Sequence, residues 1–368
     1  MEARGLIEPE FWRHETPVLV GASHGPPAGL PGLVYFQTSG STGVPKWIGL
    51  SRRALQISAK TVNEHLDVSS SSVWALALPI LHVGGFGVAA RAYQAGCQLV
   101  QFPGKWSAEG FSKWLHEMQA THLSLVPTQV HDLVAAGLRA PSSLRAIVVG
   151  GGVLPMPTGR TARELGWPVL ASYGMTEAGS QVATQGIELL DEPYVTGPLG
   201  ILPCWDVVIS DQGLISINGE ALFSGMLDGD LNYHERRSDQ FVTSDVGVVE
   251  DGRITVRGRA DALVKILGEL VDPVGVENEL IAASSGTISP GQIAIVAVGD
   301  SRAGSRLAVA HVGDVGQELL ERVLEKYHSE CPGFKRVTSV VAVEEIPQSA
   351  LGKVLRKELI RIVEGRQI

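Results

Sequence analysis

One short stretch near the start of the chain constrains its fold more than any other. Residues 38–46 read Thr-Ser-Gly-Ser-Thr-Gly-Val-Pro-Lys and follow a short apolar run at residues 33–36. Hydroxyl side chains, exposed backbone N–H groups and a lysine within one short stretch are typical of a loop that binds phosphate groups. The glycines let the backbone approach a polyphosphate because they carry no Cβ. The stretch therefore predicts a strand followed by a phosphate-binding loop.

The loop differs from the Walker A pattern in two places. Counted from Gly40, its lysine falls at the expected distance, but Pro45 replaces the second glycine and Trp47 replaces the magnesium-binding Ser or Thr. A Walker-type triphosphatase is therefore disfavoured. A flexible surface loop is disfavoured as well, because linkers seldom end in Pro-Lys before a new apolar run. The candidate phosphate-binding residues are Thr38, Ser39, Gly40, Ser41, Thr42, Gly43 and Lys46.

Composition limits the class of protein. The chain has 368 residues, of which 44% are hydrophobic and 19% charged, so we expect a folded protein of two or three domains. A formal net charge of −9 argues against nucleic acid as the main partner, but not against a small polyanion held by local basic groups. The three cysteines are far apart, which argues against a zinc site or a disulfide framework. Without a bilayer-length apolar run or a signal-peptide core, we expect a cytoplasmic protein with no membrane span.

Strand-like and helix-like segments alternate through the first two thirds of the chain. This rhythm predicts an α/β fold with a largely parallel sheet. The expected strands are 73–78, 98–102, 121–126, 144–149 and 168–172. The expected helices are 52–65, after the N-cap Ser51, and 108–119 and 128–137.

The pattern changes twice after that. Short strands joined by Gly/Asp turns predict a small β-rich subdomain at 207–209, 214–217 and 253–257. After Gly258 we expect an α+β arrangement, with helices at 276–283 and 317–331 and strands at 293–298 and 307–312. We place the boundary near Asp261. The chain then consists of a large N-terminal α/β domain of layered sheets at 1–260 and a small C-terminal domain at 261–368.

A second polar motif follows the expected strand 168–172. Ligands of open α/β sheets bind at the carboxyl ends of the strands, and Tyr173, Thr176 and Glu177 stand there. An aromatic ring can stack on a nucleobase, a hydroxyl can reach a phosphate, and a carboxylate can hold Mg²⁺. The alternative is a polar turn with a solvated glutamate.

Three further motifs are weak when taken singly. The glycines after the strand 144–149 form either a tight turn or a flat backbone surface for adenine. A carboxylate and an arginine can bind vicinal ribose hydroxyls, although such residues at turns are usually solvated. A lysine follows a glycine turn near the C-terminus. These motifs are Gly150, Gly151 and Gly152; Asp245 with Arg259 and Gly268; and Lys353.

Taken in this order, the motifs resemble those of the adenylate-forming enzymes: acyl-CoA synthetases, peptide-synthetase adenylation domains and luciferases. The resemblance covers about residues 34–356 and at least four motifs. It implies that the loop 38–46 holds the β- and γ-phosphates of ATP. It also implies that Tyr173 stacks on adenine, that Thr176 contacts phosphate and that Glu177 binds Mg²⁺.

The resemblance assigns roles beyond the first domain as well. Asp245 and Arg259 would hold the ribose, Asp261 would be the hinge of a mobile C-terminal domain, and Lys353 would bridge the carboxylate and the α-phosphate. In the family reaction a carboxylate attacks ATP to give acyl-AMP and pyrophosphate, and a thiol, commonly that of CoA, then displaces AMP. Mg²⁺ and a lysine stabilise charge where the two anions meet. We therefore expect a small carboxylic acid, ATP and CoA as substrates, with Mg²⁺.

Two features depart from the family pattern. Ala262 stands where the family often has a second acid after the hinge, which affects hinge details rather than catalysis. Only 37 residues precede the phosphate loop, whereas most relatives have a much longer N-terminal part. We expect the architecture to be trimmed there, or completed by a second subunit as in a homodimer.

The segment 79–91 is similar to one in the o-succinylbenzoate–CoA ligases of menaquinone synthesis, which also place an arginine at this spacing after a histidine. The motif 173–181 resembles the same subfamily. That acid has a second carboxylate that needs a cation, so we expect Arg91 to bind it, with Ser180 as a polar contact and His82 lining the pocket. The alternatives are a helix-surface arginine for Arg91 and a capping or satisfied core imidazole for His82.

The sequence therefore predicts an acid–CoA ligase, and o-succinylbenzoate is the expected acid. One alternative is the same chemistry on another aryl or medium-chain acid. Another is a non-catalytic homologue that binds adenylate. The intact Lys353, Glu177 and loop 38–46 argue against the second alternative, because a protein that only binds needs no lysine for transition-state charge.

Overall fold

The apolar run before the predicted phosphate loop forms a strand, and the residues after that loop form another. The computed structural model describes residues 2–23, 25–38, 46–260, 262–300, 302–348 and 354–366. β2 (Val34–Thr38) and β3 (Lys46–Leu50) pair antiparallel, with Thr38 opposite Lys46. Three more strands complete a sheet in the order β1-β2-β3-β13-β14: β1 (Val18–Val20), β13 (Gly225–Leu227) and β14 (Tyr233–Glu235).

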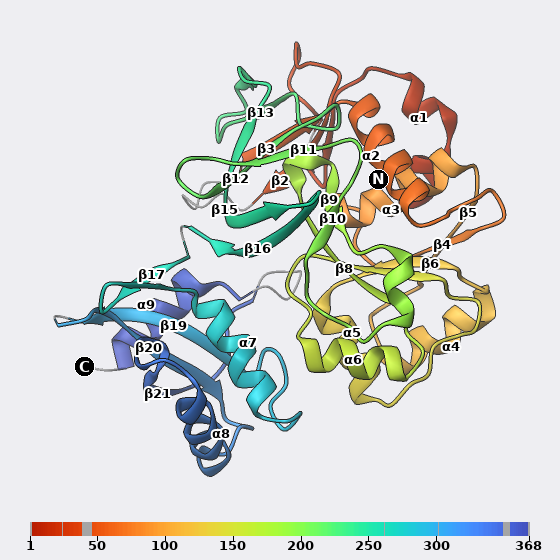
Figure 1. Cartoon of the computed structure of the whole chain (residues 1–368). Coiled ribbons are helices and arrows are strands. Elements are labelled where there is room, and N and C mark those ends of the chain that lie inside the picture. The colour runs from red at the N-terminus through yellow and green to blue at the C-terminus, as the bar shows by residue number, and fades with distance from the viewer. Residues whose placement is uncertain are drawn as a thin grey trace. The chain divides into compact units, whose positions relative to one another are not determined.

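A second, eleven-stranded sheet has the order β11-β12-β15-β16-β10-β9-β8-β7-β6-β4-β5 (Figure 1). Its parallel part is β4 (Val73–Leu76), β5 (Gln98–Gln101), β6 (His122–Leu125), β7 (Ala146–Val149) and β8 (Val169–Met175). β9 then pairs β8 antiparallel, and the pairs β9–β10, β10–β16 and β11–β12 are antiparallel as well. The remaining strands are β9 (Ser180–Thr184), β10 (Leu199–Ile201), β11 (Asp206–Ile209), β12 (Leu214–Asn218), β15 (Phe241–Glu250) and β16 (Arg253–Arg259).

Helices connect the parallel strands. α2 begins where the Ser51 hydroxyl accepts a hydrogen bond from the N–H of Ala54, and α4 begins in the same way at Ser107. α3 presents buried residues on nearly every side, as expected for a helix inside a core. The helices are η1 (Ala3–Ile7), α1 (Pro9–Arg13), α2 (Arg52–His65), α3 (Val83–Ala95), α4 (Ala108–Met118), α5 (Pro127–Ala135), α6 (Met156–Glu164), η2 (Thr176–Ala178) and η3 (Ile187–Asp191).

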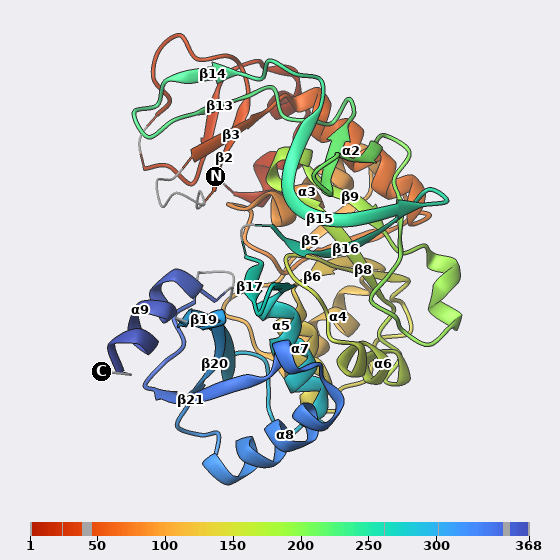
Figure 2. The same cartoon turned by 60° about the vertical axis from the view of Figure 1, so that its left-hand side comes forward.

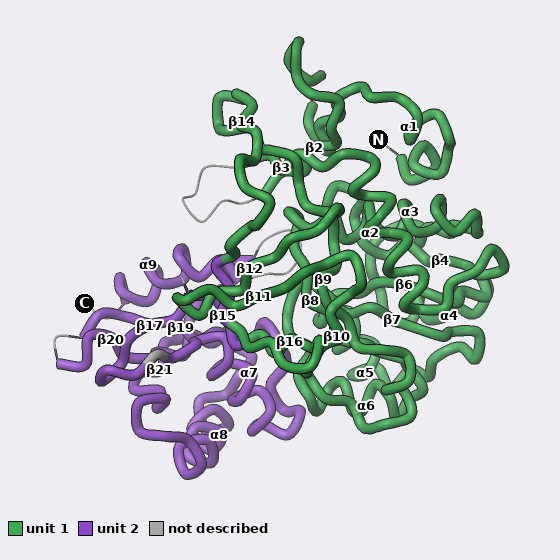
Figure 3. The backbone as a smooth tube through the Cα atoms, turned by 45° about the horizontal axis from the view of Figure 1, so that its top comes forward, with its two compact units in different colours: residues 1–243, 247–256 green, residues 244–246, 257–368 purple. Residues whose placement is uncertain are grey.

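The contacts divide the chain into two compact units (Figure 3). Unit 1 holds residues 1–243 and 247–256, and unit 2 holds residues 244–246 and 257–368. The N-terminal segment of unit 1 is held by Arg52, which is 7% exposed. Its guanidinium donates to the carbonyls of Phe11, Thr16 and Gly32 at 2.6, 2.9 and 3.0 Å. Three backbone oxygens thus accept hydrogen bonds from the guanidinium of one buried arginine.

Unit 2 is built on the three-stranded sheet β19-β20-β21. Alternate residues of β19 and β20 point to opposite faces. Ile293 and Ile295 pack in a core with α7 and α8, while Ala294 and Val296 pack in another with α9 (Figure 2). The elements are β17 (Val264–Ile266), β18 (Glu269–Val271), α7 (Pro273–Ala283), β19 (Ile293–Asp300), β20 (Gly304–Val312), α8 (Gln317–Glu330), η4 (Gly333–Lys335), β21 (Val337–Val343) and α9 (Arg356–Arg366).

The α/β class is confirmed, but two expectations about the sheets need correction. The sheet is mixed, since the strands from β4 to β8 are parallel whereas β8 pairs β9 antiparallel. The expected β-rich subdomain is not separate either. Its strands extend the eleven-stranded sheet, while β13 and β14 join the sheet of β2 and β3, because an edge strand offers unpaired N–H and C=O groups to the next strand. Within the described ranges, no helix is both long and apolar enough to cross a membrane.

Candidate nucleotide and acid site

The two ends of the predicted phosphate loop lie side by side. The hydroxyl of Thr38 at the end of β2 donates to the carbonyl of Lys46 at the start of β3, at 3.3 Å. The predicted loop residues between them lie outside the described residues: Ser39, Gly40, Ser41, Thr42 and Gly43. The structure therefore gives the base of the loop, an antiparallel strand pair, and the loop itself stays a prediction.

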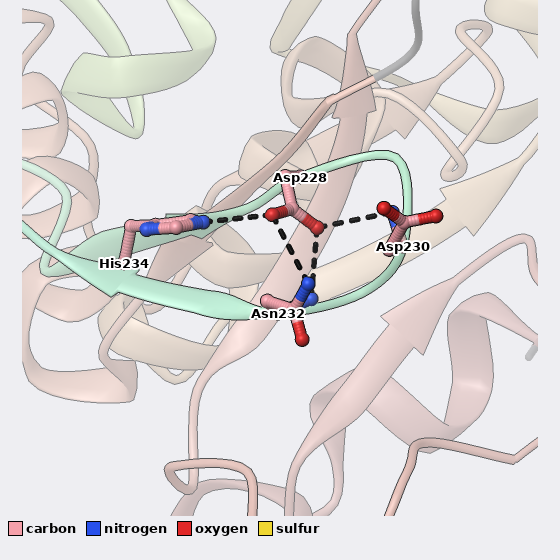
Figure 4. A network of polar contacts seen from close by, with 4 residues as sticks. All are labelled: Asp228, Asp230, Asn232 and His234. Atoms are coloured by element: carbon pink, nitrogen blue, oxygen red, sulfur yellow. Dashed lines mark hydrogen bonds and ion pairs between the residues drawn. The ribbon is translucent and has the colours of Figure 1, made fainter.

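The turn between β13 and β14 follows the strand that pairs with β3. Leu227 lies opposite Trp47, so Asp228 comes next to the base of the loop in register. Its carboxylate accepts hydrogen bonds from the backbone of Asp230 and Asn232 and from the side chains of Asn232 and His234 (Figure 4). The bond from His234, with those from Asn232, lowers the pKa of Asp228 to about 2. The sequence analysis missed this network.

The predicted adenine and magnesium motifs meet at one edge of the parallel strands. Gly150 follows β7, and its N–H donates to the carbonyl of Leu125 on β6. Tyr173 lies in β8, which runs further than expected, and Thr176 and Glu177 form the short helix η2 that follows it. Carboxyl ends of neighbouring parallel strands are where ligands of such sheets bind. The fold thus brings the motif Gly150, Gly151 and Gly152 and the motif Tyr173, Thr176 and Glu177 to the same edge.

Close backbone packing after β8 explains one glycine of the second motif. A Cβ on Gly174 would lie 1.8 Å from the carbonyl oxygen of Ser180. Ser180, which opens β9, has a φ of 136°, a value that residues with a side chain rarely adopt. Strained residues of this kind persist where the surroundings hold them and often mark functional sites.

Arg91 is buried and not on the helix surface. It is 1% exposed, and its guanidinium donates to the hydroxyls of Ser124 on β6 and Ser180 on β9, at 3.0 Å each. It also lies over the ring of Trp74, 5.3 Å from the centroid. Among the described residues no carboxylate pairs with it, and burial lowers its pKa to about 9. Arg91 therefore remains a buried cation at neutral pH with neutral partners.

Two residues around Arg91 were missed by the sequence analysis. Ser124 contacts its guanidinium, and Asn63 donates to its backbone carbonyl at 2.9 Å while accepting from the indole of Trp74. The only signal in the sequence was that Ser124 and His122 are polar residues inside an otherwise apolar strand. Their spatial relation to Arg91 is a tertiary contact that periodicity does not reveal.

His82 comes directly before α3. Its backbone carbonyl accepts the N–H of Phe86, but its side chain does not cap the helix. The imidazole is half-buried, and burial lowers its pKa, so it is neutral at pH 7. The alternative of a capping imidazole is therefore wrong, and a pocket-lining role stays a prediction.

The predicted ribose-binding pair lies in unit 2. The carboxylate of Asp245 and the guanidinium of Arg259 are 3.8 Å apart, and the N–H of Ala260 donates to the carbonyl of Ser244. Gly268 has a φ of 92° in the turn between β17 and β18, where a side chain would be strained. The structure thus brings Asp245 and Arg259 together, whereas Asp261 and Lys353 lie outside the described residues.

No group of three or more His, Cys, Asp or Glu side chains in the described parts of the chain is arranged to hold a metal ion. Mg²⁺ is commonly bound by one or two carboxylates together with substrate phosphates and water. A single carboxylate such as that of Glu177 therefore fits the chemistry expected of Mg²⁺ bound with ATP.

A strand pair at the base of a predicted phosphate loop, with further predicted nucleotide motifs at the edge of a parallel sheet, is the arrangement expected of a nucleotide-binding α/β enzyme. Residues 29–225, more than half of the chain, match the family of AMP-binding enzymes, and the chain belongs to that family.

Individual relatives are acid–CoA ligases. A 2-succinylbenzoate–CoA ligase of Bacillus cereus is 27% identical over 344 residues, which cover 90% of this chain and 70% of the relative. The o-succinylbenzoate CoA synthetase (MenE) of Bacillus subtilis, in complex with its acyl-adenylate intermediate OSB-AMP, has a TM-score of 0.76 at 24% identity, covering 88% of this chain and 68% of that one. Its complex with ATP and a magnesium ion has a TM-score of 0.75 at 24% identity, covering 88% and 69%.

The anthranilate CoA ligase AuaEII, in complex with anthranoyl-AMP, also has a TM-score of 0.76, at 20% identity, covering 91% of this chain and 68% of that one. Adenylate-forming acid–CoA ligase chemistry is thus common to the family and these relatives. Since relatives of one fold are bound to adenylates of different acids, the fold by itself does not select the acid.

Proposed function

We propose that the chain is an AMP-forming ligase that joins o-succinylbenzoate to CoA. The observation that carries the proposal is Arg91, a buried cation whose described partners are two hydroxyls and an aromatic ring. A buried charge without a counter-ion is costly, so it is retained where an anion arrives to pair with it. o-Succinylbenzoate offers that anion, because it has one carboxylate to activate and another to bind.

The surroundings of Arg91 support this assignment. Ser180 is in contact with the guanidinium and lies three residues after Glu177, the end of the motif that in this proposal holds the adenylate. A Cβ on Gly87 would lie 3.2 Å from Nη2 of Arg91, so a glycine at this position keeps one side of the guanidinium clear. Arg91 would bind the second carboxylate, Ser180 would orient it, and His82 would line the pocket as a neutral imidazole.

For the nucleotide we propose the roles that the family resemblance implies. The loop between Thr38 and Lys46 binds the β- and γ-phosphates, Gly150 to Gly152 and Tyr173 hold adenine, and Thr176 contacts phosphate. Glu177 holds Mg²⁺, which supplies charge stabilisation when bound. Asp245 and Arg259 take the ribose hydroxyls. Unit 2 carries Lys353 and moves about Asp261 between the two half-reactions.

Pyrophosphate release with a panel of acids tests the reaction and the acid. We expect release with o-succinylbenzoate and ATP, and formation of AMP and the CoA ester once CoA is added. Benzoate, anthranilate and octanoate are the matched monocarboxylic acids. Turnover of one of these but not of o-succinylbenzoate would refute the acid and leave the reaction class standing, and no release with any acid would favour a non-catalytic protein.

Lys353→Ala separates the two half-reactions. Loss of a positioned cation should slow acyl-adenylate formation by about 10²–10³-fold, as for other preorganised donors. Ester formation from supplied acyl-AMP and CoA makes no bond to phosphorus and should keep most of its rate. If the lysine variant loses both steps equally, the proposal of a moving domain is wrong.

Asp261→Pro tests the proposed hinge. Proline restricts φ at this position and should impair whichever of the two steps the locked orientation disfavours.

A further inference from the structure

An ion pair lies at one edge of the sheet in unit 2. Glu277 on α7 and Arg356 at the start of α9 are 2.5 Å apart, between Oε2 and Nη2. Both side chains are mostly buried, with 12% and 21% of their surfaces exposed. Burial raises the pKa of the Glu277 carboxyl, and Arg356 opposes that shift.

Both members of the pair also bind the backbone of β19, which is an edge strand. The N–H of Ile295 donates to Oε2 of Glu277 at 3.0 Å, and Nε of Arg356 donates to the carbonyl of Ile295 at 3.4 Å. The N–H and C=O of one residue point to the same side of a strand, and among the described strands β19 pairs only with β20. The two charged side chains therefore satisfy backbone groups that an edge strand leaves open.

The same arginine ends the segment that carries Lys353. The chain enters that segment at Pro347 and Gln348 and leaves it at Val354 and Leu355. Gln348 and Val354 form a β-bridge, and the N–H of Leu355 donates to the carbonyl of Pro347 at 2.8 Å. The next residue is Arg356. The base of the segment is thus closed by backbone bonds and fixed to α7 and β19 by one guanidinium.

We propose that Glu277 and Arg356 are positioning residues for acyl-adenylate formation, acting by fixing the base of the segment that presents Lys353. The inference rests on the proposed function of Lys353. Neither residue touches the reacting atoms in this scheme. Displacement of a catalytic group by about 1 Å can cost roughly 10²-fold in rate, so an anchor three residues away has a measurable effect.

Arg356→Met is the main test, assayed with ATP and o-succinylbenzoate or, if that acid is not turned over, the acid of the panel that releases pyrophosphate fastest. We expect kcat of adenylation to fall about ten- to a hundredfold while KM for ATP and for the acid stays within about twofold. Arg356→Lys keeps the charge and should recover part of kcat. Ester formation from supplied acyl-AMP should change little.

Two further variants separate positioning from general damage. Glu277→Gln with Arg356→Met removes both charges but keeps an acceptor for Ile295, so no buried charge is left unpaired, and it should lose kcat as the single variant does. Glu279→Gln is the control. It lies on the same helix and breaks the pair of Glu279 with Lys335, 2.6 Å apart, without touching α9, so adenylation should be unchanged. Thermal unfolding verifies that each variant is folded.

Adding Lys353→Ala decides between the possible outcomes. If Arg356 acts through the lysine, Arg356→Met with Lys353→Ala is no slower than Lys353→Ala alone. Additive losses, a rise in KM at constant kcat, or a loss no greater than that of Glu279→Gln would overturn the inference and leave the lysine's role intact. Normal adenylation by Lys353→Ala would overturn that part of the proposed function and the inference with it.

Discussion

Arg91 in unit 1 and Arg356 in unit 2 are both largely buried, but the groups that surround their charges differ. Arg356 has a carboxylate 2.5 Å away, and both members of the pair bind backbone. Arg91 is more deeply buried but is held by the hydroxyls of Ser124 and Ser180 and by the face of Trp74. Arg52, the third case, donates to three carbonyls and fixes the N-terminal segment.

The difference separates a structural arginine from one suited to bind a ligand. Arg356 has its counter-charge within the protein, in the carboxylate of Glu277. The carbonyls bonded to Arg52 add no charge, but they tie it to the N-terminal segment and so give it a structural role. Hydroxyls orient Arg91 but add no negative charge, so the cost of burying it is only partly offset. A buried arginine without a counter-ion therefore contributes little to the stability of the fold, whereas it can bind an incoming anion strongly.

The largest expected effect concerns the ion pair. Arg356→Met leaves Glu277 buried without its partner and should lower the free energy of unfolding by about 3 kcal/mol. Arg91→Met removes a charge that had no counter-ion and should lower it by less than about 1 kcal/mol. Urea unfolding followed by circular dichroism measures both. Equal losses would remove the distinction between the two arginines.

Arg91→Ala should weaken binding of the acid and not of ATP. A charge-assisted hydrogen bond contributes on the order of 1.5–3 kcal/mol, so KM for o-succinylbenzoate should rise roughly ten- to a hundredfold. KM for a monocarboxylic acid should change much less. Steady-state assays with both acids check this, and an unchanged KM for the dicarboxylic acid would leave Arg91 as a packing residue.

His122 adds a pH dependence to unit 1. Burial lowers its pKa to about 4, against an opposing hydrogen bond to the carbonyl of Leu66. Below about pH 6.5 the unfolded chain takes up a proton that the folded chain does not, so stability is full above that pH and falls toward pH 4. The loss between pH 7 and pH 5 should be about 2 kcal/mol.

The measurement is tryptophan fluorescence during urea unfolding, because all seven tryptophans lie in unit 1. His122→Gln should flatten the pH dependence in that range. The exposed His116→Gln should not. A wild-type curve as flat as that of His122→Gln would contradict the assignment.

The smallest expected effect concerns the space that Gly87 leaves beside the guanidinium of Arg91. Gly87→Ala places a Cβ 3.2 Å from Nη2 of Arg91, so the guanidinium must shift by a few tenths of an ångström. We expect KM for o-succinylbenzoate to rise roughly three- to tenfold. Gly84→Ala, on the same helix, brings its Cβ only to ordinary contact with Leu78, at 3.7 Å, and should leave KM unchanged. Equal KM values for the two variants would show that binding of the acid does not depend on free space beside the guanidinium of Arg91.

Local signals in the sequence predicted much of the fold. The cap at Ser51 marked the start of α2, whose bounds are as expected. The sequence did not indicate that β8 continues through Met175, because that extension depends on pairing with β9. Strand partners distant in the chain leave no periodic signal, which is also why the β-rich stretch looked like a separate subdomain.

Sequence motifs proposed the candidate site residues, but they did not indicate the environment of those residues. The motifs identified the candidates, and the strand order explains why Gly150 and Tyr173 lie at one edge. The burial of Arg91 did have a signal in the sequence, since the residues of α3 around it are apolar or glycine on nearly every side and such helices are buried. The strain at Ser180 and the ion pair at β19 had none, because both arise from contacts between distant segments.

The pairing of β3 with β13 has a consequence for the order in which the protein is made. β2 and β3 are synthesised early, but Ile48 pairs with Met226, far along the chain. Closing so long a loop is slow, and contacts of this kind form late in folding. On the ribosome, β3 therefore remains an open edge until β13 has emerged. A nascent or truncated chain that stops before residue 225 has most of the predicted nucleotide motifs, but it lacks the complete sheet at the base of the predicted phosphate loop.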